Sequence, residues 1–257
     1  MFVYQYPNFT KGRILKKEML ENLRDYPRTF IDLLFEGYSD GVIVGAQIQV
    51  EGDFLIITSG IIKHNGKMYI LEKGYQVPYY ATGKDCMIKI LFKEESIDDD
   101  FRSCATEIAL DQNMEIKHNE QELGRFKLKV GARLRLDYRD LRDFSTEYNT
   151  VNTIHVAYAG FAKSTISPAL LRYFAIEMFK NNSSNPLDLI FSMQCMSQGT
   201  VDKDIILHYI ANRLGIEYKE HSNGQIHKYL TLILENAKGG TTIRSGNRNA
   251  FQRVIVD

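Results

Sequence analysis

Apolar and polar side chains alternate along residues 42–50, and this period of two predicts a β-strand with one buried face. The inward positions would be Val42, Val44, Ala46, Ile48 and Val50. Turn sequences follow at 51–53 and 64–66, and the second contains Asn-Gly, a strong hairpin signal because both residues accept positive φ. The pattern therefore predicts successive antiparallel strands at 42–50, 54–62 and 67–72.

Three later segments have the apolar and β-branched character of strands, at residues 86–92, 104–110 and 125–130. In the last of them the inward side chains would be Phe126, Leu128 and Val130, and the outward ones Arg125, Lys127 and Lys129. Together with the first group, these strands predict a β-rich body.

Helical spacing appears before this body, along Lys16–Phe35. Tyr26-Pro27 interrupts it, because proline lacks the N–H that an α-helix uses. We therefore expect two short helices, or one helix followed by a bent segment. The segment could be an arm that docks on a neighbouring subunit, or it could fold back on the protein's own sheet, and the sequence leaves both open.

Between the strands and the C-terminal third, two segments are less clear. Leu134, Tyr138 and Leu141 recur at helical spacing, which favours a further helix. Residues 150–161 are ambiguous between a strand and an irregular linker.

The C-terminal third predicts four helices. The first begins at Ser167-Pro168, where serine can cap the helix and proline suits its first position. After the polar run 181–186 we expect helices at 186–197, 201–214 and 225–236, with Thr200 and Asn223 at the N-caps of the last two and Gly199 and Gly215 just past helix ends. The apolar side chains expected to face one another in this bundle are Leu187, Ile190, Phe191, Ile206, Ile210, Leu214, Ile226, Leu230 and Ile233.

The predicted fold class is α+β, with four parts. These are an N-terminal helical arm (1–37), an antiparallel β-rich body that ends in a helix (38–180), a small helical bundle (181–236) and a basic extended tail (237–257). Both ends carry apolar side chains on segments with few local means of burying them. The candidate interface residues are therefore Phe9, Ile14, Phe30, Phe251, Val254 and Val256.

Composition is that of an ordinary globular protein, with 44% hydrophobic and 25% charged residues among 257. A net charge of zero argues against a protein that coats nucleic acid. The three cysteines, Cys86, Cys104 and Cys195, are widely spaced and odd in number, so we expect buried thiols rather than disulfides or a zinc site. No apolar run is long enough to span a bilayer, which predicts synthesis in the cytoplasm without membrane insertion.

Charge changes sign abruptly in the second half of the β-rich body. Residues 94–122 contain ten acids against two bases, and residues 125–135 contain five bases and no acid. We expect the basic stripe to pair with the acidic segment or with an acidic neighbour, because no aromatic side chains interleave on its outward face to stack nucleic-acid bases. Within the acidic segment, Asp98, Asp99 and Asp100 are expected to form a solvated loop rather than a metal site.

A search for catalytic motifs finds no phosphate-binding loop, no His-Glu-x-x-His, no Gly-x-Ser-x-Gly and no Gly-x-Gly-x-x-Gly after a strand. The six histidines have no spacing that would place a metal-binding pair on one helix face. We therefore expect no enzyme activity and assign no catalytic, cofactor-binding or metal-binding residue.

Several segments resemble a family of structural proteins. They begin at Glu122 (Glu-Leu-Gly-Arg-Phe-Lys-Leu), Gly131 (Gly-Ala-Arg-Leu-Arg), Phe144 (Phe-Ser-Thr-Glu-Tyr-Asn-Thr) and Ser164 (Ser-Thr-Ile-Ser-Pro-Ala-Leu-Leu). With the strands before them, these segments resemble baseplate and tail-fibre-connector proteins of contractile phage tails and phage-tail-like bacteriocins from Gram-positive bacteria. The resemblance runs from about Lys11 to the end of the chain.

The resemblance implies a structural component of a contractile injection system. Its partners would be other baseplate or tail-fibre proteins, in multiple copies within a symmetric assembly, and its mature location would be the tail of the virion or tail-like particle. The alternative is a tail-associated protein that binds carbohydrate or hydrolyses the cell wall, since the two carboxylates of such an enzyme can lie far apart in the sequence.

Overall fold

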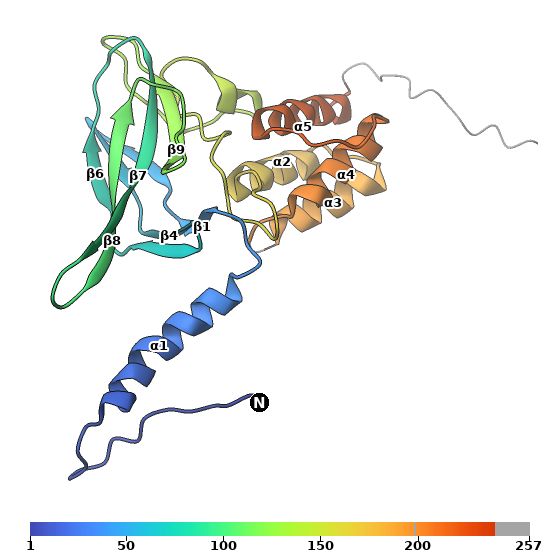
Figure 1. Ribbon diagram of the computed structural model, residues 1–257. Coiled ribbons are helices and arrows are strands. Elements are labelled where there is room, and N and C mark those ends of the chain that lie inside the picture. The colour runs from blue at the N-terminus through green and yellow to red at the C-terminus, as the bar shows by residue number, and fades with distance from the viewer. Residues whose placement is uncertain (198, 240–257) are drawn as a thin grey trace, which may run out of the picture.

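The computed structural model describes residues 1–197 and 199–239, and it arranges them in three parts: a projecting N-terminal helix, a β-rich body and a group of four helices (Figure 1). Three antiparallel sheets make up the body. This combination confirms the predicted α+β class.

The N-terminal helix α1 (Lys17–Leu34) is a single helix that continues through Pro27, so the expected break at that residue is wrong. None of its residues is buried. Pro27 has no N–H, so one carbonyl group of α1 lacks a donor within the helix. Because α1 is exposed, water can bind this carbonyl group. Figure 1 shows α1 extending away from the sheets, which also excludes the alternative that it folds back on them.

Six short strands form two sheets of three. β1 (Gly41–Gly45), β4 (Gly60–His64) and β5 (Lys67–Leu71) make one, and β2 (Ile48–Glu51), β3 (Phe54–Ile57) and β6 (Tyr75–Pro78) make the other. The strands expected at 42–50 and 54–62 are therefore each divided between two sheets, and β6 was not predicted.

The first of these breaks has a local cause at Gly45 and Ala46, which both have positive φ, 66° and 50°. A Cβ atom on Gly45 would lie 2.0 Å from the carbonyl oxygen of Ser59, so only glycine fits there. Before this turn, an irregularity between Val42 and Val44 shifts the register of β1 against β4, and Val44 is 56% exposed instead of facing inward.

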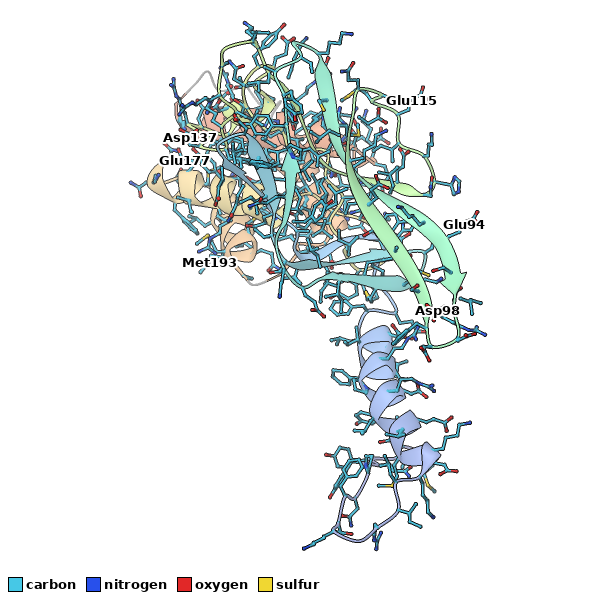
Figure 2. All side chains as sticks on the ribbon, turned by 90° about the vertical axis from the view of Figure 1, so that its left-hand side faces the viewer. Glu94, Asp98, Glu115, Asp137, Glu177 and Met193 are labelled. Carbon is cyan, nitrogen blue, oxygen red and sulfur yellow. The ribbon has the colours of Figure 1, made fainter. Side chains whose placement is uncertain are left out.

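The third sheet has the order β8-β7-β9 and is formed by β7 (Asp85–Ile97), β8 (Arg102–Asp111) and β9 (Glu120–Lys127). The β7–β8 hairpin is longer than predicted, and Asp98 lies at its tip, on the side of the body from which α1 extends (Figure 2). β9 starts and ends earlier than expected, so Phe126 and Leu128 are buried but Val130 is 84% exposed.

Residues 128–167 connect the sheets to the helices without the predicted helix. The segment contains only one short 3₁₀ turn, η1 (Arg142–Ser145), and residues 150–161 form an irregular linker held by isolated β-bridges. The apolar residues of the expected helix are shared between two cores: Leu134 packs with the sheets, and Leu141 packs with the helices. Their spacing therefore reflects two separate contacts and not one helix face.

The four C-terminal helices lie where the sequence predicted them: α2 (Pro168–Lys180), α3 (Pro186–Met196), α4 (Lys203–Leu214) and α5 (Asn223–Ala237). Gly215 ends α4 with a φ of 64°, as its position suggested. The caps of α4 and α5 differ by one or two residues from the expected Thr200 and Asn223. Asp202 precedes α4, and Ser222 begins α5 with a capping box to Gln225.

All four helices share one apolar core, to which α2 contributes Leu170, Phe174 and Met178. The sequence analysis had placed α2 at the end of the β-rich body. The linker also enters this core through Phe144 and Ile154. The expected inward residues of α4 and α5 are buried, with Ile206, Ile210 and Leu230 fully enclosed, except Leu214, which is only partly buried.

Candidate interaction surfaces

The root of α1 is fixed to the body by a buried lysine. Lys63 of β4 donates from Nζ to the carbonyl oxygens of Phe35 at 2.6 Å and Tyr38 at 2.7 Å. An ammonium group at this end of a helix satisfies carbonyls that have no partner within the helix, and it opposes the negative end of the helix dipole. Tyr38 also forms a β-bridge with Phe161. The direction in which α1 leaves the body is therefore set by the body itself.

Beyond this root, α1 presents apolar side chains to solvent. The exposed ones are Leu20, Leu23, Tyr26, Phe30, Leu33 and Leu34, between 46% and 65% exposed. A hollow of about 360 Å³ separates Leu33 and its neighbours from the turn between β4 and β5. We take this apolar face of α1 as the first candidate interaction surface, because a contiguous exposed apolar patch marks an interaction site more often than scattered residues do.

The candidate interface residues from the sequence are only partly within the described chain. Phe9, Ile14 and Phe30 are 57%, 86% and 61% exposed, and Phe30 lies on the apolar face of α1. Phe251, Val254 and Val256 fall outside the described residues. The assignment of these six side chains to an interface stays a prediction.

A second apolar surface lies on α3, where only Phe191 of the three side chains predicted to face inward is buried. Leu187 and Ile190 were expected to be buried, but they are 43% and 64% exposed, beside Leu189 at 39% and Met193 at 66%. Figure 2 shows Met193 directed away from the body. These four residues form the outer face of α3.

The inward face of α3 instead buries polar side chains, Asp188 and Ser192, beside Phe191 and Cys195. Asp188 is fully buried and accepts hydrogen bonds from Tyr209, Arg213 and Ser183 at 2.6–2.8 Å. Such a network stabilises a buried carboxylate that would otherwise be costly. The signal that could have revealed it is the uniformly apolar outer side of α3, which leaves the single acid of this helix to face its neighbours.

The junction between the sheets and the helices contains a cavity of about 500 Å³, lined in part by Arg142, His155, His227 and Glu235. His155 also borders two smaller hollows of about 270 and 220 Å³. Burial lowers the pKa of His227 below the ordinary value of 6.5, and partial desolvation by the surrounding protein lowers the pKa of His155 in the same direction although its side chain is exposed. Both rings are therefore neutral near pH 7, and the junction can offer hydrogen bonds without a positive imidazole.

One of the smaller hollows contains an unsatisfied donor. Gln121 is 8% exposed, and its Nε2 atom has no hydrogen-bond partner. It lines the 270 Å³ hollow together with Asp40, His64 and Glu122. These groups would suit a neutral hydroxyl-rich ligand, which is the chemistry of a sugar. No local sequence pattern indicates this junction, because its residues come from distant parts of the chain.

Charged residues pair differently from the sequence prediction. Of the basic stripe 125–135, Arg125 pairs with Glu122 of the acidic segment, but Lys127 contacts Glu147 and Asp85, and Arg135 contacts Asp143. Lys129 lies over the ring of Tyr148, 4.1 Å from its centre. The acidic segment itself is balanced by other lysines, among them the buried Lys89, which contacts Asp111 and Glu120.

The cysteines and acids show no metal-binding arrangement in the part of the chain that the structure describes, since no three His, Cys, Asp or Glu side chains gather closely enough. Cys86 and Cys195 are buried as predicted, and burial raises the pKa of Cys86 to about 11. Cys104 differs from the prediction. It is half-buried, with Lys67 Nζ 3.0 Å from its sulfur. No helix among the described residues is both long and apolar enough to cross a membrane.

Comparison with known proteins gives little guidance. No protein-family model and no curated protein matches this chain. Among solved structures, the crystal structure of TssK is 8% identical, with a TM-score of 0.42 over 91% of this chain and 69% of that one. The cryo-electron-microscopy structure of the type VI secretion system TssK-TssF-TssG baseplate subcomplex is also 8% identical, with a TM-score of 0.39 over 92% of this chain and 100% of that one. TM-scores below 0.5 do not establish a shared fold, so these likenesses leave the function open.

Proposed function

We propose that this chain is a structural subunit of the baseplate of a contractile phage tail or phage-tail-like bacteriocin, where it connects other baseplate or tail-fibre proteins. The observation that carries the proposal is the apolar face of α1, which is held out from the body with none of its residues buried. The outer face of α3 supplies a second surface on a separate part of the molecule. Two such surfaces suit a protein that joins two partners.

In this role the chain acts through protein–protein contacts, without a catalytic residue, a cofactor or nucleic acid. It is made in the bacterial cytoplasm and is incorporated into the tail in several copies. The resemblance of residues 122–128, 131–135, 144–150 and 164–171 to tail proteins of Gram-positive phages and bacteriocins supports the same assignment.

The test is deletion of the gene from the strain that produces the particles, followed by electron microscopy. We expect incomplete particles, and complete ones after the full chain is restored. Restoring the chain with Ile190→Asp on the outer face of α3 should fail, because a charge there weakens an apolar contact. Asn182→Asp, on the neighbouring loop, is the matched control and should succeed. Complete particles without the gene would contradict the proposal.

The cavity at the junction favours a second candidate, a tail-associated protein that binds carbohydrate or hydrolyses the cell wall. Its size falls within the usual range of small-ligand sites, and His155, which lines it, also borders the hollow that contains the unsatisfied amide of Gln121. Incubating the purified protein with cell walls separates the two. The structural role predicts that no soluble cell-wall fragments are released. Release of fragments by the native protein but not by a His155→Ala variant would establish the second candidate.

A further inference from the structure

The apolar side chains of α1 follow a coiled-coil spacing. Met19, Leu23, Tyr26, Phe30 and Leu33 are separated by four, three, four and three residues. This alternation is the a/d repeat by which one helix packs its side chains between those of another. Leu20 and Leu34 widen the stripe on one side.

Every charged residue of α1 lies away from this stripe. At 100° per residue, each is about 100° or more around the helix from the centre of the stripe. They are Lys17, Glu18, Glu21, Arg24, Asp25, Arg28 and Asp32. When two copies of one chain pack the same face together about a symmetry axis, a charge near the axis lies close to its own counterpart, so like charges there would repel. The stripe of α1 contains none.

The helix also needs a partner on energetic grounds. An isolated helix of 18 residues with an interior proline is marginal in water. The protein's own body offers no compensation beyond the last turn, since no residue of α1 is buried. Covering Phe30 and Tyr26, which are 61% and 46% exposed, would supply the missing apolar burial.

We propose that α1 is a self-association surface, through which two or more copies of this chain pack their seams of Met19, Leu23, Tyr26, Phe30 and Leu33 against one another. The inference deepens the proposed function by naming a second copy as one partner, and it rests on that function only for its setting in the tail. The anchoring of the root by Lys63 fixes the direction in which each copy presents its helix.

The test is sedimentation velocity of the full chain over a range of concentrations up to about 100 μM, a range that detects weak association. We expect an oligomer that dissociates on dilution. The double variant Leu23→Gln with Phe30→Gln should weaken association more than tenfold. The matched control, Arg24→Gln with Arg28→Gln, changes the opposite face with the same new residue and should associate like the native chain.

Disulfide formation gives an independent measurement. Tyr26 lies in the seam near the middle of α1, where counterparts from two copies come within disulfide range in either helix orientation. Tyr26→Cys should therefore cross-link two chains under mild oxidation, and Asp25→Cys, on the polar face, should not.

A native chain that stays monomeric throughout the range, or seam and control variants that associate equally, would overturn the inference. The native chain would also stay monomeric if α1 were covered by a second protein or by the chain's own residues 1–15. The proposed function is tested separately, by whether particles are complete without the gene. If the native chain is monomeric but deletion of its gene still leaves incomplete particles, only self-association is overturned.

Discussion

α1 and α2 are both helices with an apolar face, yet they use that face in opposite ways. α2 buries Leu170, Leu171, Phe174, Ala175 and Met178 in the core of the four-helix group. α1 buries nothing and holds its apolar face in solvent. The comparison shows that helical periodicity predicts a helix and an apolar stripe, but not whether the chain itself covers that stripe.

The position of proline distinguishes the same two helices. Pro168 occupies the first turn of α2, where its missing N–H would have no partner in any case. Pro27 lies inside α1 and removes one internal hydrogen bond. α2 is thus well formed and well packed, whereas α1 depends on what it contacts. We expect the stability of the monomer to be insensitive to α1 and highly sensitive to α2 and its neighbours.

The largest effect should come from a charge placed in the core that α2 shares with α4. Ile206 is fully buried there, and Ile206→Asp would enclose a carboxylate without a partner. We expect a loss of more than about 4 kcal/mol and an unfolded helical group, seen as a loss of ellipticity at 222 nm. Leu20→Asp in α1, measured at a dilution where the chain is monomeric, should leave the unfolding midpoint unchanged. A folded Ile206→Asp protein would contradict the burial of that residue.

A matched pair of phenylalanines tests the contrast directly. Phe174 of α2 is fully buried between aromatic rings of Phe191 and Tyr209, so Phe174→Ala should cost about 3–5 kcal/mol in urea unfolding. Phe30 of α1 is 61% exposed, and Phe30→Ala should cost less than about 0.5 kcal/mol in the monomer. Similar losses for the two variants would show that α1 packs on its own body.

Two aspartates extend the comparison to charge and pH. Asp143, beside the helical core, accepts two hydrogen bonds from Arg135 at 2.6 and 2.8 Å, and this guanidinium lowers the pKa of the carboxyl well below its ordinary 3.8. A lowered pKa in the folded state stabilises the protein above the unfolded pKa, and the benefit is lost as pH falls toward the folded value. Asp143→Asn should therefore cost about 1.5–3 kcal/mol at neutral pH.

The difference between Asp143→Asn and the native chain should shrink as the pH falls from about 6 to about 3, through the ordinary carboxyl range. Asp25 of α1 is the control. It pairs with Arg24, but both side chains are more than half exposed. Exposed pairs contribute little, so Asp25→Asn should be nearly neutral at every pH. Urea unfolding at several pH values measures both, and a pH-independent cost for Asp143→Asn would show that its ion pair is not what stabilises the fold.

The sequence predicted the fold well wherever a signal was local. The four C-terminal helices follow from apolar spacing, from Pro168 and from Gly215, and the first hairpins follow from their turn residues. The failures came where a contact is distant. Gly45 and Ser59 approach closely across two strands and divide them between sheets, and Leu134 and Leu141 serve different cores although their spacing is helical.

The candidate surfaces were predictable only in part, for the same reason. The apolar residues of α1 can be found in the sequence, but their exposure depends on the body, which does not cover them. The outer face of α3 was missed because Asp188 is satisfied by Tyr209 and Arg213, both on α4, so the polar side of α3 is its inner side. The junction around His155 joins residues that are widely separated in the sequence, and no local pattern indicates it.

The smallest effect on stability should come from removing most of α1. Trypsin can cleave after Lys16, Lys17, Arg24 and Arg28, all exposed, and no buried contact holds α1 against local opening. In the monomeric Leu23→Gln, Phe30→Gln chain, we expect these sites to be cut before Arg172 and Lys180 of α2. The trimmed body should keep its free energy of unfolding within about 0.5 kcal/mol, because Lys63 still binds the carbonyls of Phe35 and Tyr38. At a concentration where the native chain associates, self-association predicts that trypsin cuts it after Lys17 more slowly than it cuts the Leu23→Gln, Phe30→Gln chain. The Arg24→Gln, Arg28→Gln control still associates and should be protected at Lys17 like the native chain. An α1 that resists trypsin as well as α2 does in the monomer would mean that its apolar face is covered within a single chain.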